Sequence, residues 1–211
     1  MQNKILDIII SPPKIVRSAF PNFVWEKSEN ENNIYLTFDD GPSEELTFWI
    51  LDELKKYNAK ATFFCVGDNV AKYPESYNRI LQENHSVGNH TFNHLNGYKT
   101  KSSDYINNFA KANEIIDSNL FRPPYGRIKK SQAKEILKSK KIIMWNVLSL
   151  DYSNKISPQQ CFENIKKYTT SGSIIVFHDN KKAEKNMKYA LQKTLEYYSE
   201  KNYTFEKIVV K

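Results

Sequence analysis

The order of apolar and polar positions along the chain predicts strands and helices in alternation. The β-type run Ile34–Phe38 is followed by two aspartates and Gly-Pro, which ends a strand. In the segment 43–58, leucine and isoleucine recur every three or four residues, which predicts a helix with Ser43 as its N-cap. The same two patterns repeat downstream. Further strands are predicted at ATFFCV, around Val87, and at KIIMWNVL, SIIVFHD and TFEKIVV, and further helices at PESYNRILQEN, 103–117, from 131, SPQQCFENIKKY and 183–198.

This alternation predicts the α/β class, with a mostly parallel sheet that is covered by helices and is either open or closed into a barrel. In both variants the chemistry gathers at the carboxyl ends of the strands. Asp39 and Asp40 stand at such an end. Two adjacent carboxylates repel each other unless a cation lies close to them, so the pair indicates a cation at this edge.

The length of 211 residues and the hydrophobic content of 40% suit one domain with a sizeable core. We predict that this domain spans residues 31–211 and that an N-terminal extension, residues 1–30, packs on it. The extension is rich in rings and prolines, unlike a mobile tail. The alternative is that its rings form an exposed patch for a partner or a membrane surface. These residues are Phe20, Phe23, Trp25, Pro12, Pro13 and Pro21.

The net charge of +7 suggests an anionic polymer as a partner, but the lysines are scattered and no nucleic-acid-binding motif accompanies them. Nucleic-acid binding is therefore not expected. No apolar run approaches the length of a transmembrane segment, and the run near the N-terminus is too short and too soon interrupted for a secretion signal. From the sequence alone we expect a cytoplasmic monomer.

The two cysteines, Cys65 and Cys161, form no CxxC motif. Cys65 lies within the apolar run ATFFCVG and is interpreted as a buried thiol. The sequence leaves a disulfide between the two open.

Two of the four histidines, His90 and His94, stand four residues apart in HTFNH. If this segment begins a helix, the spacing directs both imidazoles the same way. Two imidazoles and one carboxylate form a common open site for a divalent ion. The alternative for a lone HxxxH pattern is a polar helix face without any metal.

Two further residues, His178 and Asp151, stand at or just beyond predicted strand ends, and a third, Arg122, stands in a segment predicted as a strand or a loop. His178 ends the apolar run SIIVFHD, Asp151 follows WNVLSL, and Arg122 precedes two rigid prolines in FRPPYG. His178 also has an ordinary interpretation as a core histidine satisfied by backbone, and Arg122 has one as a solvated surface residue. His85 fits no such pattern and is interpreted as a loop residue.

The segments TFDDGP, HTFNH, RPPYG, WNVLSLDY and VFHD, in this order, resemble the five motifs of the NodB-type polysaccharide deacetylases, carbohydrate esterase family 4. The resemblance covers about residues 33–210 and implies a distorted (β/α) barrel with fewer than eight strands. It implies that Asp40, His90 and His94 bind a divalent metal, usually zinc, with cobalt, nickel or iron as alternatives.

The resemblance also implies the remaining roles. Asp39 would be the general base, Arg122 would pair with Asp39, His178 would be the general acid, and Asp151 would tune His178. The substrate-binding residues would be Tyr125, through its backbone N–H, together with Pro123, Tyr152 and Val176. Tyr152 and Val176 replace the Trp and Leu that are usual in the family, which leaves the width of the acetyl pocket open.

The implied activity is metal-dependent hydrolysis of N-acetyl groups on an N-acetylglucosamine-containing poly- or oligosaccharide of the peptidoglycan or chitin type. A water activated at the metal would attack the acetamide. The alternatives are a catalytically inactive carbohydrate-binding relative and a deacetylase of a small amino-sugar conjugate. A non-haem iron oxygenase also uses two histidines and a carboxylate, but it needs no base–acid pair such as Asp39 and His178.

Overall fold

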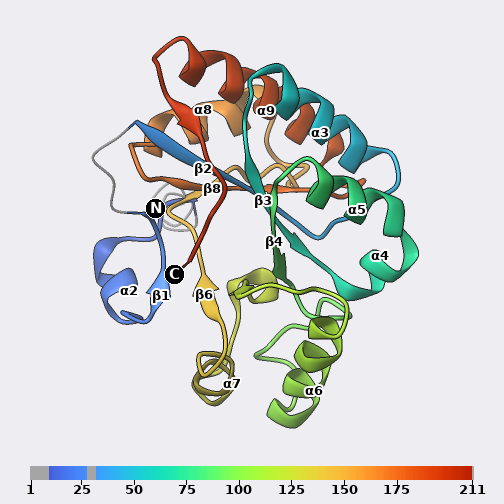
Figure 1. The fold of residues 1–211 in the computed structure, drawn as a ribbon. Coiled ribbons are helices and arrows are strands. Elements are labelled where there is room, and N and C mark those ends of the chain that lie inside the picture. The colour runs from blue at the N-terminus through green and yellow to red at the C-terminus, as the bar shows by residue number, and fades with distance from the viewer. Residues whose placement is uncertain (1–9, 28–31, 211) are drawn as a thin grey trace.

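The computed structural model describes residues 10–27 and 32–210, in which helices surround a curled, mainly parallel sheet (Figure 1). The strands are β1 (Phe23–Val24), β2 (Asn33–Asp39), β3 (Ala61–Cys65), β4 (Ser86–Asn89), β5 (Leu120–Phe121), β6 (Lys141–Ile143), β7 (Val147–Leu148), β8 (Ile174–His178) and β9 (Thr204–Phe205). The helices are α2 (Lys14–Ser18), α3 (Leu46–Lys56), α4 (Gly67–Lys72), α5 (Pro74–Gln82), α6 (Ser102–Asn113), the 3-10 turn η1 (Pro124–Gly126), α7 (Lys130–Ile136), α8 (Pro158–Tyr168) and α9 (Glu184–Ser199). The predicted alternation of strands and helices is thus confirmed.

The sheet curls because β6 and β7, which are consecutive in the chain, lie near opposite ends of its hydrogen-bonded path. The order is β1-β6-β5-β4-β3-β2-β8-β7, and β9 pairs with the start of β2. Only three residues, 144–146, separate β6 from β7. Such a short connection requires the two ends of the path to lie close together, which gives an incompletely closed barrel.

The segment KIIMWNVL is therefore two strands, and the prediction of one strand is wrong. Within it, β6 pairs with β5, whereas β7 pairs with β8. The side chain of Asn146 causes the change of partner, because its Oδ1 accepts a hydrogen bond from the backbone N–H of Ile174 at 2.8 Å and its Nδ2 donates to Ser173. After Asn146 these contacts direct the chain to pair with β8, near the other end of the sheet path.

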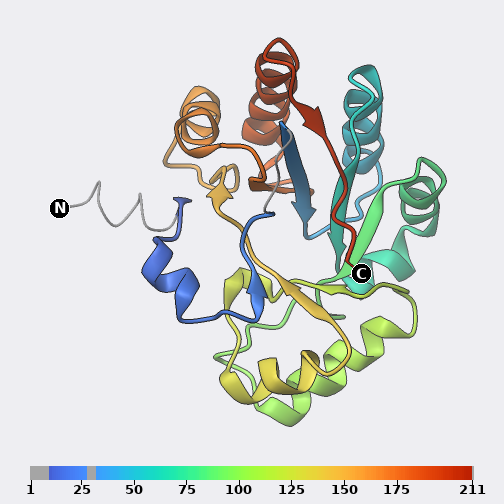
Figure 2. The same cartoon turned by 60° about the vertical axis from the view of Figure 1, so that its left-hand side comes forward.

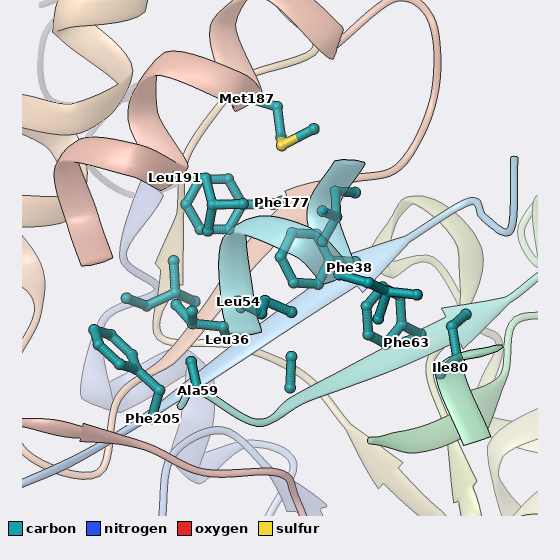
Figure 3. Close-up of a cluster of buried hydrophobic side chains, with 14 of the residues drawn as sticks. Leu36, Phe38, Leu54, Ala59, Phe63, Ile80, Phe177, Met187, Leu191 and Phe205 are labelled. Atoms are coloured by element: carbon teal, nitrogen blue, oxygen red, sulfur yellow. The ribbon is translucent and has the colours of Figure 1, made fainter. Parts of the chain in front are cut away.

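The outer face of the sheet carries the main hydrophobic core. Alternation along β2 turns Leu36 and Phe38 outward, where they meet apolar side chains of α3 and α9 (Figure 3). The Phe38 ring is stacked against Phe63 at 5.0 Å and against Phe177 at 5.7 Å. The alternate residues on β2, Thr37 and Asp39, face the barrel interior, where both accept hydrogen bonds from Arg122.

The predicted helix after the first long strand begins later than expected. Helix α3 starts at Leu46, and Ser43 is not its N-cap. Instead, the Ser43 hydroxyl donates a hydrogen bond to Asp179 at 2.7 Å. By contrast, α8 has the expected type of start, with a Ser157 N-cap and a reciprocal Gln160 contact.

The described part of the N-terminal extension contacts the barrel beside β6 (Figure 2). The Met144 N–H donates to the Val24 carbonyl at 2.7 Å. Phe23 and Trp25 pack against the apolar cluster under α6 and α7. Helix α2 differs, because it buries no residue and Ile15 is 80% exposed. Residues 1–9 and 28–30 of the predicted extension lie outside the described residues, and the domain boundary stays a prediction.

Both cysteines are buried free thiols, as interpreted for Cys65, and they form no disulfide. His85 does stand in a loop, but it is buried, and its Nδ1 accepts a hydrogen bond from the Ala61 N–H at 3.1 Å. This burial lowers the pKa of His85 to about 4. No helix in residues 10–27 or 32–210 is long and apolar enough to cross a membrane.

Candidate active site

The residues predicted to carry chemistry meet at the carboxyl edge of the central strands. Asp39 and His178 end neighbouring parallel strands and stand in register with each other. His90 follows the last residue of β4, and Arg122 follows β5. The sheet therefore brings together residues that lie far apart in the sequence, as expected for this class of fold.

Asp40, His90 and His94 form a group of possible metal ligands, with one candidate donor atom of each lying within 4.8 Å of the others. The Oδ1 atom of Asp40 is 3.0 Å from His94 Nε2 and 3.6 Å from His90 Nε2. The Nδ1 atom of His90 is 2.7 Å from the carbonyl oxygen of Arg122. Because a carbonyl oxygen only accepts hydrogen bonds, Nδ1 carries the proton and the Nε2 lone pair faces Asp40.

The HTFNH segment is not helical, so the helical arrangement considered for His90 and His94 is wrong. Thr91 and His94 have φ values of 64° and 54°, and the next helix, α6, begins only at Ser102. Side chains hold the loop in place: the Thr91 hydroxyl accepts from the Leu95 N–H at 3.1 Å. The loop nevertheless brings the two imidazole rings to a centroid distance of 5.1 Å.

Two asparagines hold Asp40, and sequence reasoning missed both. Asn180 donates to Asp40 Oδ2 at 2.6 Å, and Asn69 donates to the Asp40 carbonyl at 2.7 Å. The only signal for Asn180 was its position directly after VFHD. Burial raises the pKa of Asp40, but the facing imidazoles of His90 and His94 outweigh burial and hold that pKa well below its ordinary value.

These donor atoms fit a divalent ion such as zinc. Two ligands bound to tetrahedral zinc at about 2.0–2.1 Å lie roughly 3.3 Å from each other. The separations from Asp40 Oδ1 to the two imidazole nitrogens bracket this value. The second oxygen of Asp40 is held by Asn180, which leaves Oδ1 as the donor that faces the imidazoles.

Asp39 has a different partner, the guanidinium of Arg122. The Nη1 atom of Arg122 donates to Asp39 Oδ1 at 2.7 Å and to Thr37 Oγ1 at 2.8 Å. Arg122 is fully buried, and it also donates to the carbonyls of Ile143 and Met144. Sequence reasoning missed Thr37, although it is the first letter of TFDDGP. The expected pairing of Arg122 with Asp39 is present, and the adjacent acids face different partners.

His178 is held by both oxygens of Asp151. Its Nδ1 is 2.7 Å from Oδ1, and its backbone N–H donates to Oδ2 at 2.8 Å. Burial by itself lowers the pKa of His178, but the Asp151 carboxylate outweighs it and raises that pKa to about 9. The proton on Nδ1 is shared with Asp151, so Nε2 is the nitrogen free to act toward a substrate.

The predicted substrate-binding residues occupy different surroundings. Tyr125 is 60% exposed, and its ring centroid is 4.6 Å from that of His94. Tyr152 meets the His178 ring edge-on at 4.9 Å. Pro123 is buried beneath the Tyr125 turn, and Val176 is buried two residues before His178. The contacts of these four residues with a substrate stay predictions.

Comparison with known proteins identifies the family. Residues 26–142 match the polysaccharide deacetylase family model. The chain is 38% identical over 156 residues to a peptidoglycan-N-acetylglucosamine deacetylase of Bacillus cereus, covering 71% of this chain and 56% of that protein. A second B. cereus protein of the same name is 34% identical over 195 residues, covering 86% of this chain and 88% of that one. The chain therefore belongs to the polysaccharide deacetylase family.

A solved structure supports the same assignment. It is the crystal structure of a peptidoglycan N-acetylglucosamine deacetylase in complex with a naphthalenyl N-hydroxybenzamide. The two chains are 32% identical with a TM-score of 0.82, covering 89% of this chain and 91% of that one. This similarity confirms the predicted fold class, the distorted (β/α) barrel, and with it the family resemblance.

Proposed function

We propose that this protein is a metal-dependent hydrolase that removes the N-acetyl group from N-acetylglucosamine residues of a glycan, with peptidoglycan as the favoured substrate. The division of the aspartate pair carries the proposal: Asp40 faces two imidazoles, while Asp39 faces the Arg122 guanidinium. The names of the relatives, which specify peptidoglycan, support the choice of substrate.

The acetamide is a poor electrophile, so two kinds of assistance are needed. A divalent ion at Asp40, His90 and His94 would polarise the acetamide carbonyl and acidify a water molecule. Asp39 accepts the proton of the attacking water, since its Oδ2 lies 4.0 Å from His90 Nε2, beside the candidate ligands. Arg122 binds the other oxygen of Asp39, Oδ1, which leaves Oδ2 to face the candidate ligands.

The departing amine must be protonated, and His178 is placed to do this. Its Nε2 faces the same edge as Asp39, because the two residues are in register on adjacent strands. Asp151 holds the imidazole in one orientation and favours its protonated form. The Tyr125 N–H is proposed to donate to the oxyanion, a type of contact worth about 2.7–4 kcal/mol. Tyr152 and Val176 are proposed to line the acetyl pocket, with Pro123 supporting the turn.

Zinc is the proposed metal because two imidazole nitrogens and one carboxylate oxygen are a common open zinc site. Cobalt, nickel and iron are the alternatives, and reconstitution with each metal distinguishes them. The protein is proposed to act as a monomer. The cytoplasmic location stays a prediction, which cell fractionation tests against an action on wall polymer.

The test is acetate release across four substrates: peptidoglycan fragments, chitin oligomers, an acetylated surface polysaccharide and a small amino-sugar conjugate. We expect release from peptidoglycan fragments, abolished by a chelator and restored by Zn²⁺ or Co²⁺. If the protein binds one equivalent of metal and a glycan but releases no acetate from any substrate, it is the carbohydrate-binding relative instead.

A further inference from the structure

Within the part of the chain that the structure describes, the side chain of one arginine near the candidate site has no polar partner. Among residues 10–27 and 32–210, Arg127 is exposed and forms no ion pair and no side-chain hydrogen bond. The other three arginines of the chain all have carboxylate partners. Their pairs are Arg17–Glu26, Arg79–Asp52, Arg79–Glu83 and Arg122–Asp39.

The backbone of Arg127 is nevertheless fixed at both polar atoms. Its N–H donates to the Pro124 carbonyl at 3.1 Å, and its carbonyl accepts from the Gly97 N–H at 3.2 Å. A Cβ atom at Gly97 would lie 2.4 Å from that carbonyl oxygen, so only glycine permits the contact. The side chain of Gln132, which is fully buried, donates to the Gly97 carbonyl at 3.1 Å and accepts from the Lys129 N–H at 2.9 Å. These contacts thus hold the backbone of Arg127 rigidly against the loop that contains Gly97.

Arg127 lies close to the candidate active site. It is two residues after Tyr125, so their Cα atoms are at most about 7 Å apart. The Tyr125 ring in turn contacts His94. Tyr98, which is 58% exposed, stands on the loop that contacts Arg127. Arg127 and the exposed Tyr125 and Tyr98 are therefore the residues that we consider for contact with a glycan that extends from the metal site.

We propose that Arg127 binds a carboxylate on the sugar next to the one that loses its acetyl group, so that the enzyme selects acidic glycans over neutral ones. This inference rests on the proposed function. A guanidinium presents a planar fork that matches a carboxylate in a bidentate manner. A rigid backbone lowers the entropy cost of forming the contact. Among glycans, one built with N-acetylmuramic acid has the required carboxylate, whereas chitin has none.

The test compares one peptidoglycan oligosaccharide in two forms, with free carboxylates and with those groups converted to methyl esters. The parent protein, Arg127→Gln, Arg127→Lys and Lys55→Gln are assayed for kcat/KM by acetate release. Lys55→Gln is the matched control, because it removes one exposed positive charge at the opposite end of the barrel, in the last turn of α3.

We expect the parent to prefer the carboxylate form. In Arg127→Gln the ratio of the two kcat/KM values should fall about fivefold to tenfold, mainly through KM. Arg127→Lys should recover part of the preference for the carboxylate form, and added salt should reduce this preference in the parent. Lys55→Gln should keep the parent ratio.

An equal ratio in the parent and Arg127→Gln, or an equal loss on both forms of the substrate, would overturn the assignment. If the parent released no acetate from either form, the proposed function would fail by itself. Calorimetric binding of the same two oligosaccharides to the parent and to Arg127→Gln would then decide whether Arg127 reads the carboxylate.

Discussion

At the carboxyl ends of the central strands, the two faces carry different side chains and have different tasks. On the outer face, Phe38 lies between the rings of Phe63 and Phe177 under helix α9. On the inner face, the next residue, Asp39, meets the buried guanidinium of Arg122. The alternation of one strand therefore supplies a hydrophobic contact for stability and a charged group for chemistry at adjacent positions.

The inner face also depends on complete pairing, because a buried charge without a partner is costly. Arg122 is the largest fully buried side chain among the described residues, and its Cζ atom lies 4.1 Å from the centroid of the Phe64 ring. Its hydrogen bonds to the carbonyls of Ile143 and Met144 fix the backbone where β6 ends. The contacts of Arg122 thus hold the proposed base, Asp39, and attach the end of β5 to the end of β6, whereas the outer face contributes hydrophobic burial.

The largest expected effect on stability comes from the outer face. Phe38→Ala should lower the free energy of unfolding by about 3–5 kcal/mol, because it removes a fully buried ring and leaves a cavity. Urea denaturation measures this change. Leu81→Ala is the control, since Leu81 is 45% exposed and its loss should cost well under half as much. Equal losses of unfolding free energy in the two variants would contradict the stabilising role assigned to Phe38.

The same variant also tests whether the two faces have separate tasks. Phe38→Ala should keep the metal affinity and the kcat of the parent at a temperature where it is folded, because its ring points away from the site. A large fall in kcat of folded protein would mean that the two faces are coupled.

A smaller effect is expected at the N-terminal extension. Deleting residues 1–30 should lower the free energy of unfolding by about 1–3 kcal/mol without removing any catalytic group, since Phe23 and Trp25 are half-buried on the barrel. Thermal melts measure the change, and Ile15→Ala, at an exposed position, should leave the midpoint unaltered. An unchanged midpoint and solubility after deletion would exclude packing. A stable truncation that no longer bound vesicles or a partner would favour the exposed patch.

The smallest effect is a shift in pH dependence. As the proposed general acid, His178 must be protonated to donate, so activity should fall as pH rises between its ordinary pKa of 6.5 and the raised value of about 9. A bound cation would offset the part of this rise in pKa that Asp40 causes. Because the folded-state pKa is raised, the same group contributes stability that is complete below pH 6.5 and is lost as pH rises through about 9.

Asp151→Asn tests this prediction in pH–rate profiles. The variant removes the main cause of the raised pKa, so the alkaline limb should move to lower pH. Asp68→Asn, an equal loss of charge at an exposed position on α4, should leave the limb in place. An alkaline limb that stayed unmoved in Asp151→Asn would show that another group governs it.

The parts of the fold that depend on local pattern could be predicted, and those that depend on distant partners could not. The strand before Asp39 and the helix begun by Pro74 follow from apolar spacing and local stop signals. Ser43 was misassigned because Asp179, far along the chain, takes its hydroxyl. The break in KIIMWNVL depends on Asn146 bonding to β8, which no local signal reveals.

The candidate site shows the same limit. Its residue types were readable from the motifs, because carboxylates and imidazoles at strand ends indicate a metal site. Their orientation was not, since the loop from His90 to His94 depends on left-handed backbone positions rather than a helix. The supporting contact from Asn180 to Asp40 becomes visible only once β2 and β8 lie side by side.

The central claim is that one aspartate holds the metal while its neighbour takes the proton. Metal content and kcat measured on the same samples of Asp39→Asn and His90→Ala test it directly, at a temperature where both are folded, because Asp39→Asn removes the charge that Arg122 faces. We predict that Asp39→Asn keeps one metal ion per chain while kcat falls about 10²–10⁴-fold, and that His90→Ala loses both. A parent-like kcat in Asp39→Asn, or loss of its metal, would contradict the claim.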